Sequence, residues 1–343
     1  MADVANLITD VPGVSVGHAQ DATLASGVTA VIFDAPAVAS IAIHGGAPGV
    51  RDTALLEPEM TVERIDALTL SGGSVYGLDA AGGVLEFLRA SGRGFAIGDV
   101  CVPIVPGAIL FDLLNGGDKD WRGRAPYWDL GFAAAKTAAR GFAIGSVGAG
   151  LGATTVNLKG GLGSASAVTS GGYVVGAIVA VNSVGQATIG DGPHFWAAPF
   201  ERGAEYGGLG WPASPPETAL SMRLKTDQLT NTTIAVVATD APLSKAQAKR
   251  IAIQAHDGMA HALRPSHAAL DGDLIFAAST ERNPRAPTPR ELAEIGMLAA
   301  DTLARAIARA VYEATPLKVP GALPSWREAF GARGSTSLEK GTR

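Results

Sequence analysis

The run TTIAVVAT (Thr232–Thr239) is the feature that most constrains the fold, because its apolar, strand-forming residues predict a strand buried in the core. It follows Asp191–Gln228, a segment with DGPHF, GGLGW and SPPE, few regularly spaced apolar residues and several turn formers. Irregular connections of this length are uncommon unless they are functional or disordered. The sequence therefore predicts that an irregular loop, at about residues 191–230, meets a rigid strand at Thr232.

The rest of the chain has many predicted strands and few predicted helices. Thr288, Pro289 and Glu291 give one helix an N-cap, a proline at its first position and a capping-box acid, and this helix is expected to run to about Ala314. Since strands and helices do not alternate regularly, the order favours an α+β fold with antiparallel or mixed sheets, in one composite domain of residues 1–343. The other expected strands are Val28–Phe33, Ala67–Leu70, hairpins between Phe142 and Val184, and Asp273–Thr280, and the other expected helices are Val75–Arg89, Asp129–Arg140 and one capped by Ser244.

Composition and charge limit the partners that this chain can have. Hydrophobic residues make up 47% of the 343 residues, so a sizeable core is expected. The net charge is −5 and no lysine- or arginine-rich run occurs, which argues against a nucleic-acid partner. No apolar stretch is long enough for a membrane span and the N-terminus does not resemble a secretory signal, so we expect a soluble, cytoplasmic protein. The lone Cys101 lies in an apolar run and is expected to be buried and inert.

Three interpretations compete for Asn231-Thr232-Thr233. The triplet fits a glycosylation acceptor, which requires secretion, and it also fits an ordinary strand start. In the third interpretation the chain is cut before Thr232. A threonine at a new N-terminus carries both a nucleophile, its hydroxyl, and a base, its α-amine, whose pKa lies near 7.7–8.0. The junction between the irregular loop and the strand suits such a cut.

A second candidate feature is Asp271-Gly272-Asp273, directly before the strand DLIFAAST. Two carboxylates on either side of a glycine can point into one site, orient an ammonium group and shift each other's pKa. The alternative is an ordinary Asp-Gly turn before a strand.

Other motifs carry less weight. GAGLGA (Gly148–Ala153) matches a dinucleotide fingerprint, but no acid follows it at the required distance. The spacing of His256 and His261 places them on different helix faces, so these two and His267 are expected to be solvated or capping side chains. We therefore expect neither a metal nor an organic cofactor.

Six blocks stand in order along the chain. They are ITDVPGVSVGH (Ile8–His18), SGGSVYGLDAA (Ser71–Ala81), GAGLGATTVNLKGGLGSAS (Gly148–Ser166), AVNSVG (Ala180–Gly185), NTTIAVVATDAPLSKAQ (Asn231–Gln247) and ALDGDLIFAAST (Ala269–Thr280). With these blocks the chain resembles the P1 peptidase family, which includes the L-aminopeptidase/D-esterase, the β-peptidyl aminopeptidases and the endo-type nylon-oligomer hydrolase. The resemblance spans nearly the whole chain.

The resemblance implies a four-layer αββα sandwich of the N-terminal-nucleophile type. It implies self-cleavage into residues 1–231 and 232–343, which stay together and assemble as a homo-oligomer of cleaved heterodimers, tetramer-like. By motif, Thr232 is the nucleophile and Asn231 ends the first chain. The resemblance also implies that Asn182 stabilises the oxyanion and that Tyr76 lines the substrate site or helps to hold the oxyanion. Asp271 and Asp273 are the two acids that orient the Thr232 amine.

Two departures from the family pattern bear on the prediction. In the aminopeptidase members, a serine nucleophile follows a glycine, and a serine and a glutamate occupy the positions of the downstream acid pair. This chain has NTT and DGD at these positions, as the nylon-oligomer branch does. The family lysine is uncertain in register, because it aligns with Asn157 in one branch and with Lys159 in others. Both positions are expected on one strand face, so Lys159 can serve the role, and a solvated lysine is the alternative.

These features together predict a self-processing amide hydrolase that works through an acyl-enzyme on short peptides or amide oligomers. The nearest alternative is an exo-acting aminopeptidase on the same scaffold. An acyltransferase of the ornithine-acetyltransferase type and a non-catalytic binding protein with the same fold are further alternatives.

Overall fold

The structure is a computed structural model that describes residues 5–225 and 231–331. Its strands are β1 (Val14–Asp21), β2 (Ser26–Ile43), β3 (Val50–Arg51), β4 (Arg64–Ser71), β5 (Phe95–Ile97), β6 (Val100–Val102), β7 (Gly107–Ile109), β8 (Gly161–Val168), β9 (Val174–Asn182), β10 (Thr232–Thr239) and β11 (Leu274–Ser279). Its α-helices are α1 (Ala80–Ala90), α2 (Tyr127–Lys136), α3 (Lys245–Ala262), α4 (Pro289–Tyr312) and α5 (Trp326–Phe330). Short 3-10 helices are η1 (Ile8–Asp10), η2 (Thr53–Leu56), η3 (Ser74–Asp79), η4 (Gly148–Gly150), η5 (Ala198–Phe200) and η6 (Glu217–Leu220).

The main sheet is mixed, with strand order β3-β7-β4-β2-β11-β10-β9-β8 and β1 paired to β2. β10 runs parallel to β11 and β4 runs parallel to β7, while the other neighbouring pairs are antiparallel. The long β2 strand changes register against β4 between Ile32 and Ala37, where three exposed residues interrupt its buried pattern. The predicted α+β class with a mixed sheet is confirmed.

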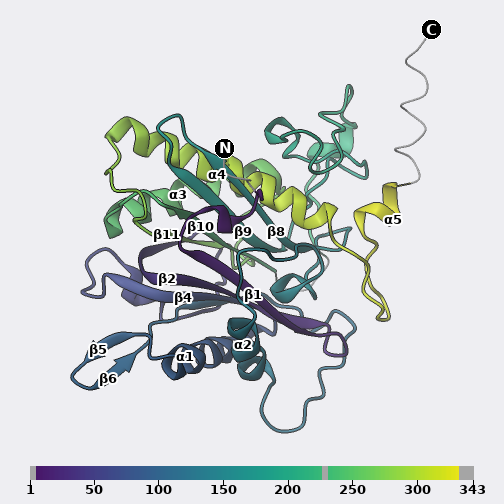
Figure 1. Cartoon of the computed structure of the whole chain (residues 1–343). Helices are drawn as coiled ribbons and strands as arrows, with labels where there is room; N and C mark the ends of the chain where they lie inside the picture. The colour runs from purple at the N-terminus through teal and green to yellow at the C-terminus, as the bar shows by residue number, and fades with distance from the viewer. Residues whose placement is uncertain (1–4, 226–230, 332–343) are drawn as a thin grey trace.

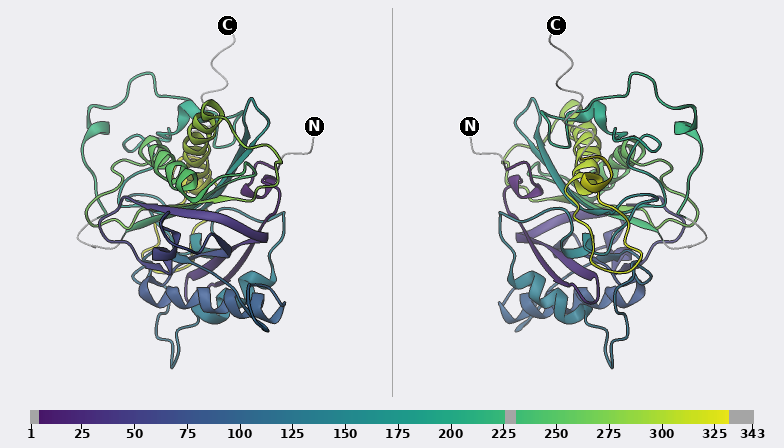
Figure 2. Two further views of the ribbon diagram at one scale, coloured as in Figure 1. Left: turned by 90° about the vertical axis from the view of Figure 1, so that its left-hand side faces the viewer. Right: turned by 90° about the vertical axis from the view of Figure 1, so that its right-hand side faces the viewer.

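Two pairs of helices lie on opposite sides of the strands (Figures 1 and 2). α3 and α4 pack on one side and α1 and α2 on the other, and the buried apolar residues form three separate clusters. One cluster lies under α3 and α4, one under α1 and α2, and the third contains no residue of an α-helix and is built mainly from strands, with Val31, Leu68, Ile178 and Phe276 among its members. The strands are therefore covered on both outer faces by helices.

The helix starts follow the sequence signals. Ser244 and Thr288 each accept a hydrogen bond from the backbone three residues on, and Gln247 and Glu291 complete the two capping boxes. The helix expected from Val75 begins instead as η3 and becomes α-helical only at Ala80. The reason is the preceding turn, in which Gly73 has a φ of 85° and its Cβ position would lie 2.0 Å from the Tyr127 ring.

Several other expectations need correction. Phe142–Val147 forms no strand, because Gly145 makes only an isolated bridge to Leu162. Cys101 is half-buried on the β5–β6 hairpin rather than buried. The predicted loop at 191–230 contains η5 and η6 up to residue 225, and its last five residues lie outside the described part of the chain. Among the described helices, none combines the length and the apolar character that a membrane crossing requires.

Candidate active site

Four strand ends meet at one end of the sheet. Because β10 and β11 are parallel, the residues that precede both strands, Asn231 and Asp271, form a bridge to each other. The antiparallel neighbour β9 ends at Asn182, directly opposite Thr232, and the antiparallel neighbour β2 ends at Ile43, opposite Leu274. The topology thus brings together segments that are far apart in the sequence.

Thr232, the predicted nucleophile, is the first residue of β10 and is buried. Its Oγ1 donates a hydrogen bond to the carbonyl oxygen of Asn231, at 2.5 Å, and the N–H of Gly272 donates to the same oxygen at 3.0 Å. A Cβ at position 272 would lie 2.7 Å from Thr232 Oγ1 and 2.9 Å from the carbonyl oxygen of Ala47. Glycine at this position therefore allows the close approach of the threonine hydroxyl.

Asp271 and Asp273 are both fully buried, and they differ in protonation. Burial, together with the charge of Asp273 and a hydrogen bond between the two carboxyls, raises the pKa of Asp271 to about 9. Burial alone would also raise the pKa of Asp273, but hydrogen bonds and charge from His267 outweigh it and lower the pKa. Asp273 also accepts the N–H of Thr233 at 2.9 Å. At neutral pH the pair therefore holds one proton, on Asp271.

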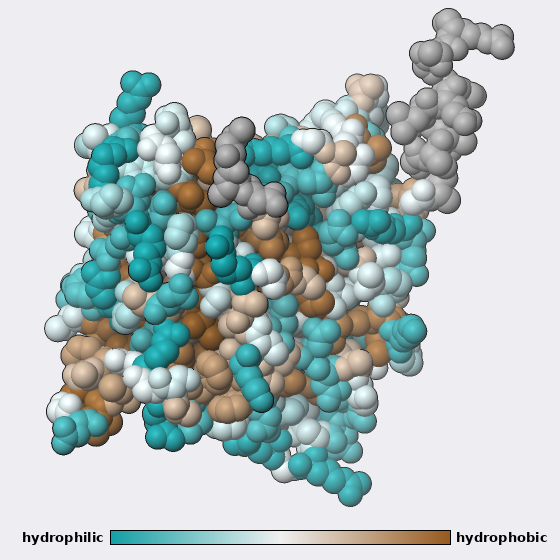
Figure 3. All heavy atoms as spheres, in the orientation of Figure 1, coloured by the Kyte–Doolittle hydropathy of each residue, from teal (hydrophilic) through white to brown (hydrophobic). Residues whose placement is uncertain are grey.

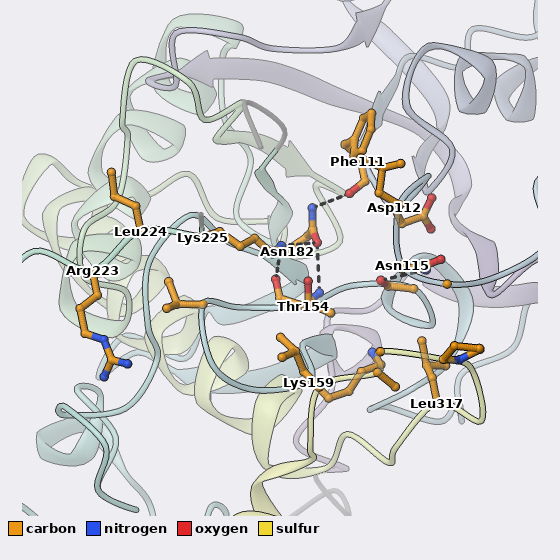
Figure 4. A pocket seen from close by; sticks show the side chains of 18 of the residues that line it. Phe111, Asp112, Asn115, Thr154, Lys159, Asn182, Arg223, Leu224, Lys225 and Leu317 are labelled. Carbon is orange, nitrogen blue, oxygen red and sulfur yellow. Dashed lines mark hydrogen bonds between the residues drawn. The ribbon is translucent and has the colours of Figure 1, made fainter. Parts of the chain in front are cut away.

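Asn182 is buried, and both the nitrogen and the oxygen of its side-chain amide are hydrogen-bonded (Figure 4). Its Nδ2 donates to the Phe111 carbonyl at 2.9 Å, and its Oδ1 accepts from the Thr154 N–H at 3.0 Å and from Lys225 Nζ at 3.1 Å. The amide is thus held beside Thr232 by three segments of the chain. Its Nδ2 has a second hydrogen, which can donate to an oxyanion while the first stays bonded to Phe111.

Lys159 is buried and its Nζ donates to the carbonyls of Gly150, Ala153 and Gly160, at 2.9, 2.8 and 2.7 Å. Burial lowers the pKa of Lys159 to about 7, but three carbonyl acceptors use all three hydrogens of the protonated amine. The lysine is therefore not solvated, and its three hydrogen bonds hold together the turn that carries Thr154.

The expectation that residues 157 and 159 share a strand face is wrong. Thr154 and Lys159 form an isolated bridge, and the residues between them make a turn. Asn157 lies in that turn, half-buried, and its Oδ1 is 3.5 Å from the Thr155 hydroxyl. Hydrogen bonds of the Thr155 backbone and hydroxyl with Leu158 close this turn and interrupt the strand.

Two cavities flank the strand ends. One, of about 800 Å³, has a mixed polar and apolar lining, and its polar residues include Asp112, Lys159, Asn182 and Lys225 (Figure 4). The other, of about 390 Å³, is mostly apolar and has Thr232 and Asn231 in its wall. Phe111 lines both cavities. A bound molecule could therefore extend from Thr232 in two directions.

Tyr76 is about half exposed at 48%, and its ring lies edge-on to Trp121 with a centroid distance of 5.2 Å. It is not among the residues that line either cavity. The motif GGSVYG instead contributes Ser74 and Val75 to the apolar cavity. Ser74 has a φ of 52°, an uncommon backbone conformation for serine. The predicted role of Tyr76 remains a prediction.

Three site residues have no signal in the sequence. Lys225 reaches Asn182 from the irregular segment, and burial lowers its pKa to about 7. Asp112 accepts from Ser26 Oγ at 2.6 Å and from the Gly73 N–H at 2.8 Å, and burial raises its pKa. His267 donates its backbone N–H to Asp273 at 2.9 Å, and its Nδ1 lies 3.0 Å from the same carboxylate oxygen. Only the fold brings these groups to the site.

The histidine prediction is wrong for two of the three residues. His261 is exposed, as expected, but His256 is buried on the other face of α3 and His267 is paired with Asp273. Burial lowers the pKa of His256 to about 3, and its Nε2 lies 3.0 Å from the Ala42 carbonyl. His44, at the end of β2, stacks on His256 with a centroid distance of 3.7 Å.

Comparison with known proteins agrees with the mixed fold. Residues 6–322 match the model of peptidase family S58, so the chain belongs to that family of peptidases. The resemblance to L-aminopeptidase/D-esterase, β-aminopeptidase and nylon-oligomer hydrolase relatives is thereby confirmed, and the chain is a hydrolase of amide bonds.

The chain is similar to two relatives at different levels of sequence identity. An uncharacterized aminopeptidase of Mycobacterium tuberculosis is 41% identical, over 96% of this chain and 100% of its own. A 6-aminohexanoate-oligomer endohydrolase of Kocuria sp. is 31% identical, over 82% of this chain and 76% of its own.

Two solved structures share the fold. A β-aminopeptidase of Burkholderia sp. aligns with a TM-score of 0.70 and 23% identity, over 98% of this chain and 95% of its own. The L-aminopeptidase D-Ala-esterase/amidase of Ochrobactrum anthropi, described as a variant of the Ntn hydrolase fold, aligns with a TM-score of 0.68 and 22% identity, over 92% and 88%.

Proposed function

We propose that this chain is an autoprocessing amide hydrolase whose nucleophile is Thr232 and whose substrates are short peptides or amide oligomers. One observation carries the proposal. The Thr232 hydroxyl lies against the carbonyl of Asn231 at the strand end where Asn182, Asp271 and Asp273 also meet. The four-layer sandwich of N-terminal-nucleophile enzymes is the architecture that we propose for the two helix pairs and the strands between them.

Self-cleavage begins with attack of Thr232 Oγ1 on the carbonyl carbon of Asn231. The negative charge that develops on the carbonyl oxygen is stabilised by the Gly272 N–H, which already donates to that oxygen. The C–N bond then breaks, the threonine nitrogen takes up the proton that the hydroxyl has lost and leaves as an amine, and an ester joins the Asn231 carbonyl to Thr232 Oγ1. Water hydrolyses this ester, which gives two chains, residues 1–231 and 232–343.

In the processed enzyme the free α-amine of Thr232 takes the proton of its own hydroxyl as the hydroxyl attacks a substrate amide. The substrate amine leaves, an acyl-enzyme ester forms, and water completes the cycle. Asn182 stabilises the oxyanion with the second hydrogen of its Nδ2, while the first stays bonded to the Phe111 carbonyl. The amine, when protonated, faces an acid pair that carries one negative charge, so Asp271 and Asp273 orient it.

We also propose that cleaved copies assemble into a homo-oligomer. The β5–β6 hairpin projects from the body beside α1 (Figure 1), and apolar surface gathers over it at the lower left of Figure 3. Four large apolar side chains on this hairpin are more than 40% exposed: Phe95, Ile97, Val100 and Val102. Apolar surface of this kind favours burial against another copy.

Turnover of matched substrates tests the proposal. The purified full chain is given aminoacyl anilides with a free or an acetylated N-terminus, and a β-lactone is used to trap the nucleophile. Hydrolysis of both substrates supports endo-cleavage, and hydrolysis of the free form alone supports the exo-acting aminopeptidase that the family relatives favour. Faster transfer of the acyl group to an added amine than to water would indicate an acyltransferase. No turnover and no adduct on Thr232 would overturn the proposal.

A further inference from the structure

Behind the acid pair, three histidines from three separate segments lie together. They are His44 after β2, His256 on α3 and His267 in the loop before β11. One ring nitrogen from each lies within 4.8 Å of the others. The rings of His44 and His256 are stacked, and His267 lies edge-on to both, at centroid distances of 5.4 and 4.7 Å. The hydrolase mechanism uses only His267, through its contact with Asp273.

The hydrogen bonds of this cluster fix which nitrogens face it. The Ala42 carbonyl can only accept, so His256 Nε2 carries a hydrogen and its Nδ1 has a lone pair in the neutral ring. Asp273 accepts from His267 Nδ1, which likewise leaves a lone pair on Nε2. Both His256 Nδ1 and His267 Nε2 are buried and have no hydrogen-bond partner among the described residues. Buried polar atoms without a partner are rare in native proteins and point to a missing ligand.

This pattern is the one that metal-binding histidines show. A ligating imidazole usually donates its other N–H to a carboxylate or a backbone carbonyl, which fixes the tautomer and the ring orientation. Here Asp273 takes that role for His267 and Ala42 for His256.

Two carboxylates also lie near His44. The carboxylates of Asp257 and Asp273 both act electrostatically on His44, while the opposing Lys249 is paired with Glu57 at 2.9 Å. His44 is exposed and gives a path from solvent.

We propose that His44, His256 and His267 bind a divalent cation of the zinc class. Imidazole is a preferred ligand of Zn²⁺, and three protein ligands leave a fourth position for water. The rings of His44 and His256 are stacked with 15° between their planes, so their in-plane lone pairs cannot both point at one ion over Zn–N bonds of about 2.0–2.1 Å. The exposed His44 ring must therefore move out of its stack on His256. The bound ion fixes His267, and through it the orientation of Asp273 beside Thr233, whether or not the chain has cut itself.

Zinc binding to the full-length, tag-free protein tests this proposal. The protein is freed of metal with a chelator, and titration with Zn²⁺ against a competing chelator gives stoichiometry and affinity, while Co²⁺ reports geometry through its visible spectrum. We expect one Zn²⁺ per chain and an intense spectrum of four-coordinate Co²⁺. His44→Gln, at an exposed position without a contact to Asp273, should weaken binding at least about tenfold. His261→Gln is the matched control, because His261 is exposed on the same helix outside the cluster, and it should bind as the parent does.

His256→Gln is a second variant that removes a buried ligand. The proposal is overturned if the parent takes up no stoichiometric Zn²⁺. It is also overturned if a folded His44→Gln protein and a folded His256→Gln protein both bind Zn²⁺ as tightly as the parent.

Discussion

Thr232 and Asn182 occupy directly opposite positions in the antiparallel pair of β9 and β10, one at the first residue of its strand and the other at the last. The hydroxyl of one residue and the amide of the other therefore project from the same end of the sheet. Thr154 and Phe111 hold the amide in place through two hydrogen bonds. In the mechanism that we propose, the two residues have complementary roles, attack on the carbonyl and stabilisation of the oxyanion.

Replacement of Asn182 by aspartate tests the oxyanion role. The aspartate keeps an acceptor for the Thr154 N–H but loses the donor that Nδ2 supplies. We expect kcat of the processed enzyme to fall by about 100- to 1,000-fold with a small change in KM. Asn283→Asp is the control, since Asn283 also accepts a backbone N–H but lies in the loop before α4. An unchanged kcat for Asn182→Asp would remove Asn182 from the mechanism.

Gly272→Ala should slow self-cleavage by at least about tenfold. The added Cβ would lie 2.7 Å from Thr232 Oγ1 and 3.0 Å from its Cγ2, so the hydroxyl must leave the Asn231 carbonyl. The fraction of cut chain is followed over time on a denaturing gel. Gly141→Ala is the control, because a Cβ there meets nothing within 4 Å. Equal cleavage rates for the two variants would mean that this close approach is not needed.

Lys159→Met should destabilise the protein and reduce its activity. Three carbonyls lose their donor, and the turn that positions Thr154 and Asn182 loosens. We expect the free energy of unfolding to fall by at least about 2 kcal/mol in urea titrations, because unpaired buried groups cost about 1–3 kcal/mol each. The exposed Lys136→Met should change it by less than about 0.5 kcal/mol. A Lys159→Met protein as stable as the parent would contradict the conclusion that Lys159 holds this turn together.

Asp271→Asn should change the pH dependence of stability. The folded chain raises the pKa of Asp271 from 3.8 to about 9, so it keeps a proton that the unfolded chain releases. Its contribution to stability is therefore complete below about pH 4 and is lost progressively as the pH rises toward 9. Asparagine stays neutral throughout, so stability should shift in favour of the variant by up to about 1.4 kcal/mol per pH unit.

The comparison is made in a Thr232→Ala background, so that both chains are uncut, with urea titrations between about pH 5 and pH 8. Parallel stability curves for the chains with and without the Asp271→Asn substitution would show that Asp271 is ionised in the fold.

Local patterns in the sequence predicted much of the fold. The capping boxes at Ser244 and Thr288 and the buried run after Asn231 appear where the sequence placed them. The sequence alone does not predict that NTT lies beside DGD. That prediction also needs the parallel pairing of β10 and β11, which no local pattern specifies. The resemblance to known peptidases supplied the link that the residues alone left open.

The remaining site residues depend on contacts between distant segments. Lys225 comes from an irregular segment without a motif, and its role appears only when its amine reaches Asn182. The helix spacing of His256 and His261 correctly separated their faces, but it could not show that His44 and His267 lie against the buried face. Spacing along one helix reports nothing about neighbours from other elements.

The mass of the intact chain shows directly whether the protein cuts itself between Asn231 and Thr232. Purified protein and its Thr232→Ala variant are analysed under denaturing conditions, with N-terminal sequencing of each species. The account predicts two fragments for the parent, one beginning at Thr232, and a single uncut chain for the variant. Thr232→Ser keeps the hydroxyl and should still cut. A parent chain that stays whole for days, or a Thr232→Ala chain that is cut at the same bond, would contradict the account.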